Sequence, residues 1–290
     1  MSLLPTVVNV LSVAVIYLLF ALAVVLAYRI SRILLFCVGE IGMVSAYVFH
    51  TTWVGMGNDY WAFWLAVQAV LLVDALIGWL LFLILEQELR NDPFIGTVLT
   101  VAISILLVGV MAVVWGSAVE QLPLPNQTVL FAGQSFSLIG LGTILVGSVL
   151  AVIVLGFFYK TNIGIELQAL ANNRKLAVLA GIPVRSRMLG VWVGASVISG
   201  IAGVLLAAVA SVSVEGAVVG FSGMVAAIIG GLTSPAGALV GALILALGET
   251  VVGLSFDIRY SIAVPVGLLV VLLAVRPWGL SARVEQITRT

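Results

Sequence analysis

Six long stretches of the chain contain no Asp, Glu, Lys or Arg, and they limit its possible folds more than any other feature. A helix needs about 20 consecutive apolar residues to cross the hydrocarbon core of a bilayer. Across the 290 residues, 63% are hydrophobic and 8% are charged, whereas about 25% of the residues in a soluble domain are charged. We therefore expect lipid around much of the exterior. The charge-free stretches are 1–28, 41–58, 93–119, 121–159, 188–214 and 216–248.

The pattern within these stretches indicates helices rather than strands. In lipid, every backbone N–H and C=O must be paired within the protein, which leaves α-helices or a closed β-barrel. Barrel strands alternate apolar and polar residues, and the run Val15–Ala27 shows no such alternation. We predict an all-α polytopic membrane protein, a single transmembrane domain over residues 1–290 with about eight spans and one shorter piece that crosses part way or re-enters. The expected spans are 7–28, 33–50, 60–85, 94–115, 137–159, 188–210, 237–255 and 260–275, and the shorter piece is 217–231.

The basic residues orient the spans, because cytoplasmic loops carry an excess of Lys and Arg. If the N-terminus is outside, every basic residue except Arg259 falls inside, and the opposite orientation reverses that balance. We therefore expect an outside N-terminus, a cytoplasmic C-terminus, a cytoplasmic loop at about 160–187 and an outside loop at about 116–136. The residues placed inside are Arg29, Arg32, Arg90, Lys160, Arg174, Lys175, Arg185, Arg187, Arg276, Arg283 and Arg289.

Composition argues against several classes of function. The net charge is zero, which gives no indication of a nucleic-acid partner. No GxxxxGK[ST] sequence occurs, so we expect no ATP-binding phosphate loop on this chain. Cys37 is the only cysteine and is interpreted as a small buried hydrophobe. Residues 1–6 carry no basic side chain and the first apolar run is long enough to span, so we expect no cleaved signal peptide.

The loop at 160–187 is the most informative polar stretch, because it combines five basic residues with one acid, Glu166. Its sequence predicts a short helix that stops near Gly181 and Pro183. Small side chains along that helix would let another backbone approach closely, and its apolar residues form no single stripe for a membrane surface. A helix that docks in a groove of a soluble partner fits this pattern, and a merely solvated loop is the alternative. The small residues are Ala169, Ala171, Ala177 and Ala180.

Several motifs in the second half of the chain occur in the order found in a known family. The segments 169–177 and 179–182 resemble the coupling-helix segment of ABC importer permeases, and they are most similar to the branched-chain amino acid branch. Segments 200–205, 230–238 and 276–280 resemble further motifs of that branch. The resemblance implies that the residues which contact an ATPase are Ala169, Leu170, Asn172, Asn173, Arg174, Lys175, Ala177, Gly181 and Ile182.

This resemblance implies a transport subunit rather than an enzyme, in the plasma (inner) membrane of a bacterium or archaeon. The implied partners are a second permease subunit, two cytoplasmic ATP-binding subunits and an external substrate-binding protein. The chain itself would bind no cofactor, and its partners would use ATP. Branched-chain or other neutral amino acids are the expected substrates, and urea or short amides are the alternative. The first half departs from the family pattern, because Leu35–Glu40 lacks the usual Asn and His and Glu86–Pro93 is altered.

Three acids, Glu40, Asp74 and Glu249, lie within expected spans. Ionisable groups in such places are costly and usually face a bundle interior or a wet cavity. Glu40 and Glu249 could therefore line the transport path or be satisfied by nearby hydroxyl and backbone groups, whereas Asp74 matches no family motif. The glycines and proline near 230–235 break a helix, which indicates either close packing or a path lining. The candidate path residues are Glu40, Tyr47, Gly230, Gly231, Ser234 and Glu249.

Two other classes of protein share single features with this chain. The segment 220–223 matches the GxSG signature of rhomboid-like proteases, whose Ser nucleophile needs a His base. The only histidine, His50, precedes Ser222, whereas rhomboids place their base after the serine. An ion-coupled secondary transporter would need no ATPase, and paired intramembrane charges would mark its ion sites. No Lys or Arg lies within an expected span, so an importer permease remains the favoured interpretation.

Overall fold

Helices account for almost all of the regular structure in a computed structural model of the chain, which describes residues 3–86, 92–124, 128–131, 134–275 and 280. The helices of the first half are α1 (Leu3–Ser31), α2 (Val38–Gly55), α3 (Tyr60–Leu85) and α5 (Pro93–Val114). A hairpin of β1 (Thr128–Phe131) and β2 (Gln134–Ser137) then leads to α6 (Leu138–Lys160), α7 (Asn162–Asn172), α8 (Arg174–Leu179) and α9 (Val184–Val209). The chain ends with the 3₁₀ turn η1 (Val214–Ala217), α10 (Val218–Gly230), α11 (Pro235–Ser255), α12 (Ile258–Ser261) and α13 (Val264–Val275).

The expectation of a helical multi-span membrane protein is confirmed, but the count of eight full spans is not. Among the described residues, six helices are long and apolar enough to cross a membrane. The expected span at 260–275 corresponds to the shorter helix α13, and α10 is short, as expected for the piece at 217–231. The six long helices are Pro5–Ser31, Tyr60–Leu85, Pro93–Val114, Leu138–Lys160, Val184–Val209 and Pro235–Ser255.

The expected span 33–50 is displaced, because a non-helical segment lies between α1 and α2. Arg32 adopts a left-handed backbone conformation, with φ 61°, at the end of α1, and α2 begins only at Val38. Two threonines of α5 satisfy the backbone of this segment: the Leu34 N–H donates to Thr97 Oγ1 at 3.2 Å, and Thr100 Oγ1 donates to the Leu34 carbonyl at 2.8 Å. Irregular backbone at membrane depth is tolerated where the protein pairs it in this way.

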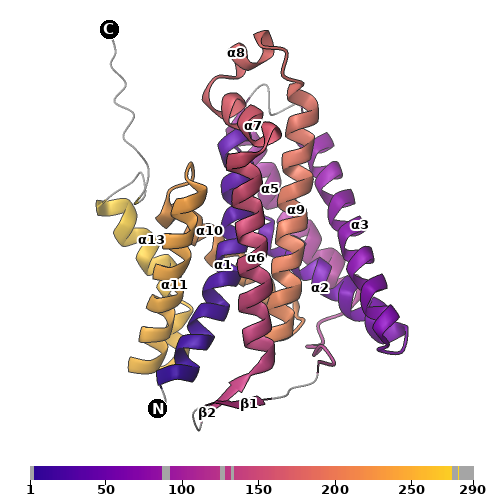
Figure 1. Cartoon of the computed structure of the whole chain (residues 1–290), viewed down its shortest axis with the longest axis vertical. Helices are drawn as coiled ribbons and strands as arrows, with labels where there is room; N and C mark the ends of the chain where they lie inside the picture. The colour runs from indigo at the N-terminus through magenta and orange to yellow at the C-terminus, as the bar shows by residue number, and fades with distance from the viewer. Residues whose placement is uncertain (1–2, 87–91, 125–127, 132–133, 276–279, 281–290) are drawn as a thin grey trace.

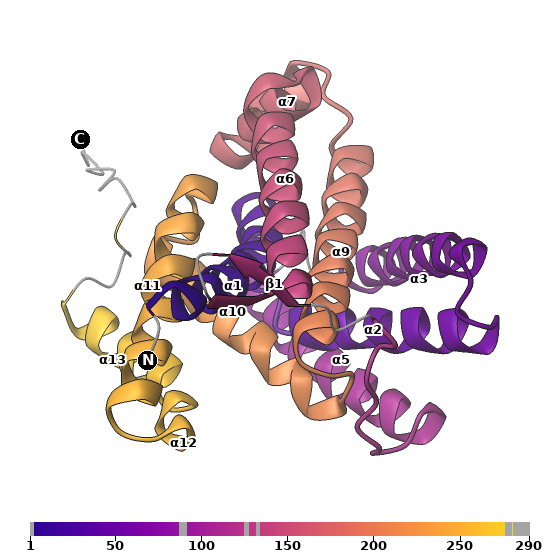
Figure 2. The ribbon, with the colours of Figure 1, turned by 60° about the horizontal axis from the view of Figure 1, so that its bottom comes forward.

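Helix α1 forms the centre of the helix assembly, with α6, α9, α10 and α11 packed around it (Figure 2). Its middle is apolar on every side, and the side chains from Leu19 to Val25 are fully buried. A helix that is hydrophobic all round belongs inside a protein. The outer helices differ, because large apolar side chains such as Leu72 of α3, Ile105 of α5 and Leu145 of α6 are exposed. These outward faces fit a lipid surrounding.

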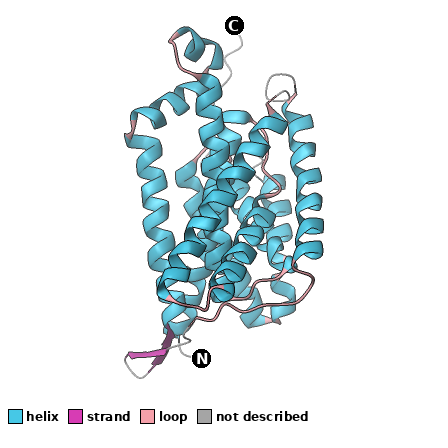
Figure 3. Cartoon of the chain, turned by 90° about the vertical axis from the view of Figure 1, so that its right-hand side faces the viewer, coloured by secondary structure: helices cyan, strands magenta, loops and turns pink. Residues whose placement is uncertain are grey.

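The two ends of the helix assembly differ in structure and in charge. Helices α7 and α8 lie at one end, and the start of α1 lies at the other end with the hairpin (Figure 1). The hairpin was not expected from the sequence; it pairs Thr128 opposite Ser137 and projects from its end of the helices (Figure 3). The α7–α8 end contains Arg29 and Lys160, which lie in the last turns of α1 and α6. The orientation of these two ends relative to the membrane stays a prediction.

Candidate functional site

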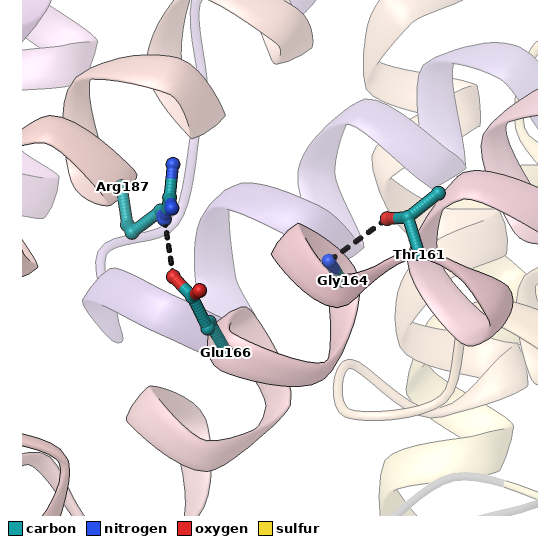
Figure 4. Close-up of polar contacts among 4 residues, drawn as sticks. All are labelled: Thr161, Gly164, Glu166 and Arg187. Atoms are coloured by element: carbon teal, nitrogen blue, oxygen red, sulfur yellow. Dashed lines mark hydrogen bonds and ion pairs between the residues drawn. The ribbon is translucent and has the colours of Figure 1, made fainter. Parts of the chain in front are cut away.

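Helix α7 is held firmly against the end of α6 and the start of α9 (Figure 4). The Thr161 hydroxyl accepts a hydrogen bond from the Gly164 N–H at 3.0 Å and so caps the helix. A side chain on Gly164 would overlap the Phe158 carbonyl, so only glycine allows this tight turn. At the other side, Glu166 forms an ion pair with Arg187 of α9 at 2.5 Å. Helix α7 therefore has a fixed orientation relative to both long helices.

The expected single helix of this loop is in fact two helices with a corner at Asn173. The Asn173 backbone is extended, with φ −152° and ψ 100°, so α7 ends there. Its side chain accepts a hydrogen bond from the Leu176 N–H at 3.1 Å, which starts α8. Asn is among the residues that favour this capping position. We refer to residues Asn162–Ile182, that is α7, the corner and α8 with its end, as the elbow.

The end of α8 is fixed by a Schellman motif, which confirms the stop expected near Gly181. The Ile182 N–H donates to the Ala177 carbonyl at 3.1 Å, and the Gly181 N–H donates to the Val178 carbonyl at 3.0 Å. This pair of bonds requires a left-handed residue, and Gly181 has φ +80°. Ile182 then packs in the same apolar cluster as Ala177. The elbow is therefore a folded unit and not a solvated loop.

The residues expected to contact an ATPase divide into an inner and an outer set. Leu170 and Ala177 are buried against Phe158 and Val191 and so anchor the elbow to the long helices. Ala169 and Ile182 are partly buried. The outer set is exposed, and it includes two large apolar side chains that sequence reasoning missed, Leu176 at 61% and Leu179 at 82% exposure. The remaining exposed members are Asn172, Asn173, Arg174, Lys175 and Gly181.

Glu40 lies in a groove of about 360 Å³ between α2, α5, η1 and α10, which we call the Glu40 groove. Ser104 of α5 donates a hydrogen bond to Glu40 Oε1 at 2.8 Å. Glu40 lies in the first turn of α2, where a carboxylate also accepts from free backbone N–H groups. The other lining residues are Phe36, Val101, Val108, Val214, Glu215, Ala217, Val218 and Phe221. Ser104 and Glu215 carried no recognisable sequence signal.

A segment that follows α5 connects two of the elements that line this groove. Trp115, at the end of α5, stacks on Tyr47 of α2, with ring centroids 5.2 Å apart. Glu120 and Val212 then exchange two backbone hydrogen bonds of 2.9 and 2.8 Å. We call residues 115–124 the strap, because it connects α5 to the segment that leads into η1. Tyr47, a candidate path residue, is therefore buried beneath the strap and is not among the residues that line the groove.

Glu249 lies in a separate polar cluster formed by α1, α10 and α11. Tyr17 donates a hydrogen bond to Glu249 Oε2 at 2.5 Å, and Ser222 lies close to the same carboxylate. The neighbours described for Ser222 are Tyr17 and Glu249 rather than His50. These contacts give Ser222 no histidine base, which argues against the protease interpretation.

Gly230, Gly231 and Ser234 form the turn between α10 and α11. A side chain on Gly230 would overlap the Gly237 carbonyl, so the two helices approach closely there. Gly231 has φ +102° and ends α10, and the Ser234 hydroxyl accepts a hydrogen bond from the Gly237 N–H at 3.0 Å. The contacts seen are those of packing and capping. The candidate path residues thus lie in several places and do not meet in one site.

The described part of the chain contains no group of three or more His, Cys, Asp or Glu side chains that could hold a metal ion. The described geometry provides two features: an anchored elbow with an exposed apolar and basic tip at one end, and a groove lined by Glu40 and Glu215 between α2, α5 and the short elements η1 and α10. Discontinuous helices commonly form the binding sites of membrane transporters.

Comparison with known proteins identifies the relatives of this chain. The family model described as "Branched-chain amino acid transport system / permease component" matches residues 6–273. The probable branched-chain amino acid transport permease protein LivH of Methanocaldococcus jannaschii is 28% identical over 91% of this chain and 87% of that protein. The high-affinity branched-chain amino acid transport system permease protein LivH of Escherichia coli is 27% identical over 93% of this chain and 92% of that protein.

A third relative is the high-affinity branched-chain amino acid transport system permease protein BraD of Pseudomonas aeruginosa. It is 27% identical over 96% of this chain and 95% of that protein. Among solved structures, PsaBC from Streptococcus pneumoniae in complex with Fab aligns over 93% of this chain and 91% of that chain, with a TM-score of 0.49 and 14% identity.

Proposed function

The chain belongs to the branched-chain amino acid transport system permease family, and on that premise we propose that it is the membrane-spanning subunit of an ABC importer for branched-chain or other neutral amino acids. The family is one of transport subunits and not of enzymes. The observation that carries the proposal is the elbow. It is a rigid pair of short helices at the basic end of the molecule, anchored by Leu170, Ala177 and the Glu166–Arg187 ion pair.

We propose that the elbow binds an ATP-binding subunit on the cytoplasmic side. Its tip presents Leu176 and Leu179 beside Arg174 and Lys175, a combination of apolar anchors and positive charge that suits a groove with acidic edges. A tip held by α6 and α9 passes a push directly into two membrane-spanning helices. The chain would use no ATP itself. Two ATP-binding subunits would bind and hydrolyse ATP. A second permease and an external binding protein would complete the importer, which would lie in the plasma membrane of a bacterium or archaeon.

The Glu40 groove is the proposed section of the path on this subunit. It combines one hydrogen-bonded carboxyl group, at Glu40, with mainly apolar walls, which suits a small solute with an ammonium group and an aliphatic side chain. Glu249, Tyr47, Gly230, Gly231 and Ser234 stay proposals for the path as a whole. Their described contacts are with neighbouring helices. Urea or short amides are the second candidate substrates, because the permease branch that transports them is very similar. The altered segments 35–40 and 86–93 leave the choice of substrate open.

Reconstituted uptake tests this function. The chain is purified with the ATP-binding subunits, second permease and binding protein from its own genome, and is placed in proteoliposomes that contain ATP. We expect uptake of radiolabelled leucine, isoleucine or valine that requires hydrolysable ATP and is insensitive to ionophores. Labelled urea measured in parallel tests the second candidate. Ionophore-sensitive uptake by this chain alone, without ATP, would contradict the proposal and would favour a secondary transporter.

A further inference from the structure

Asp74 is a fully buried acid at the junction of α2, α3 and α9, and neither the family resemblance nor the proposed path gives it a role. Its side chain is 0% exposed. Its Oδ1 lies 2.5 Å from the hydroxyl of Ser45 on α2, and its Oδ2 has no hydrogen-bond partner among the described residues. A carboxyl group that is buried between three helices of a membrane protein needs a physical explanation.

The hydrogen bonds around Ser45 indicate the protonation state of Asp74. The Ser45 hydroxyl lies 2.8 Å from the Ile41 carbonyl and 2.5 Å from Asp74 Oδ1, and both of these atoms are acceptors if Asp74 is ionised. A serine hydroxyl has one proton to donate. With an ionised Asp74 the two acceptors would have to share this one proton in a three-centre bond. With a protonated Asp74, Ser45 can donate to Ile41 and accept from Asp74, so that both contacts are full hydrogen bonds.

The charges around Asp74 also favour the uncharged acid. Among the described residues the ion pairs are Arg185–Glu86 and Arg187–Glu166, both at the α7–α8 end of the molecule. No Lys or Arg belongs to the middle of α2, α3 or α9. An ionised carboxylate without a cation in a membrane interior is strongly unfavourable, whereas a neutral acid with a hydroxyl partner is not.

Glycines on the facing helix make room for this acid. A side chain on Gly200 of α9 would overlap the Asp74 carboxyl group, so the acid occupies the space that the missing side chain leaves. One turn further along α3, a Cβ on Gly78 would lie only 2.6 Å from the Val193 Cα atom. One turn further along α9, a side chain on Gly203 would overlap the backbone of Gly42 in α2. The three helices therefore touch at backbone distance.

We propose that Asp74 is held as the uncharged acid and acts as a positioning residue that fastens α3 to the α2–α9 pair, so that the three helices move as one body. This inference rests on the proposed transport function. Helix α9 begins beside the elbow and carries Arg187, and α2 carries Glu40. A body that contains α2, α3 and α9 therefore connects the elbow to the Glu40 groove, and Asp74 keeps the groove wall aligned with the helix that receives the push.

The first test compares Asp74→Asn with Asp74→Ala in the reconstituted complex, with leucine uptake per ATP hydrolysed as the readout. The amide keeps the shape, one donor and one acceptor without charge, so we expect coupling within about twofold of wild type and an unchanged Tm. The Ala variant loses the carboxyl group and its contact with Ser45. We expect its uptake per ATP hydrolysed to fall about tenfold while ATP hydrolysis continues, an effect within the range found for residues that modulate coupling. The inference is overturned if the two variants behave alike, whether both are active or both are inactive. If Asp74→Ala cannot be purified, Asp74→Asn decides alone, since its loss of coupling would show that the charge is required.

The second test uses the purified permease and its Tm, so it does not depend on transport. Gly200→Ala should lower the Tm, and adding Asp74→Ala should restore part of that loss, because the carboxyl group that the new methyl overlaps is gone. Gly203→Ala should lower the Tm without rescue by Asp74→Ala, since its methyl meets Gly42 instead. Gly194→Ala, which has open space on the same helix, is the matched control and should change nothing. Additive effects of the Gly200 and Asp74 changes would overturn the inference. A wild-type complex that fails to take up leucine would instead refute the transport function and leave this cycle interpretable.

Discussion

Truncation of Leu179 is the most direct test of the elbow as an ATPase contact. Leu179→Ala removes three carbon atoms from a side chain that is 82% exposed in the free subunit. Burial is worth about 0.8 kcal/mol for each such carbon, so a partner that covers the exposed part would lose about 2 kcal/mol of binding free energy. This loss corresponds to about a thirtyfold weaker association. Leu176→Ala, at 61% exposure, should produce a smaller loss in the same direction.

The stability of the free subunit should not change, and this separates a lost contact from a damaged fold. Leu179 makes little contact within the chain, so Leu179→Ala should leave the Tm of the purified permease unaltered. Leu170→Ala is the contrasting variant, because Leu170 is 5% exposed within the anchoring cluster. A Leu to Ala change in a packed core costs about 2–5 kcal/mol, so this variant should lower the Tm and should loosen the elbow.

Association is measured by titration of purified ATP-binding subunits onto the permease in lipid nanodiscs, and function is measured by ATP-driven leucine uptake. We expect Leu179→Ala to weaken binding and uptake together at an unchanged Tm. Equal binding by Leu179→Ala and the wild type would refute the docking argument. Enlargement of Ala177 is a poorer test, because Ala177 is buried in the elbow's own anchor and a loss of uptake there would not distinguish a broken contact from a broken elbow.

Three further predictions concern the strap and the elbow. Cysteines at Glu120 and Val212 should form a disulfide on oxidation, since directly paired residues of this type have Cα atoms about 5.5 Å apart. The crosslink would hold the strap closed, so uptake should fall and should return with reductant. Unchanged uptake after complete crosslinking would show that the strap does not open during transport. Gly181→Ala places a methyl group on a residue with φ +80°, which costs about 1–2 kcal/mol, so amide hydrogen exchange in α8 should accelerate with little change in the global Tm; unaltered exchange would contradict the Schellman argument. Glu166→Gln removes the ion pair with Arg187, which is partly exposed and worth about 1 kcal/mol or less, so exchange in α7 should rise modestly, more at low salt than at high salt, and a rise independent of salt would point to packing instead.

The sequence predicted the elbow's position and its end correctly, but not its corner. Gly181 and Pro183 are local stop signals, so the end of α8 could be read from neighbouring residues alone. Asn173 is a weak signal in the middle of an alanine-rich run, because Asn occurs within helices as well as at caps. It ends α7 here because its side chain bonds to the Leu176 N–H. That same corner determines that Leu179 points outward and Ala177 inward, which the sequence pattern alone did not indicate.

The start of α2 and the partners of the intramembrane acids depend on residues far away in the chain. Residues 33–37 are as apolar as a membrane-spanning helix would require, and they stay non-helical while Thr97 and Thr100 of α5 bond to the backbone of this segment. Glu40 similarly finds Ser104, and Glu249 finds Tyr17, across long sequence separations. The sequence around a single serine or tyrosine in an apolar span does not indicate which acid its hydroxyl group will contact. Such pairings were therefore beyond prediction from one sequence.

The acids within the membrane share an arrangement that bears on the energy source of transport. Glu40, Asp74 and Glu249 each contact a hydroxyl group on a different helix, and the ion pairs of the described residues lie instead at the α7–α8 end. An ion-coupled transporter needs charges that gain and lose a partner at membrane depth. In this structure each of the three hydroxyl contacts joins two neighbouring helices. The described spans contain no charges paired with one another, and under the proposed function the driving force would enter at the elbow, which connects to two long helices.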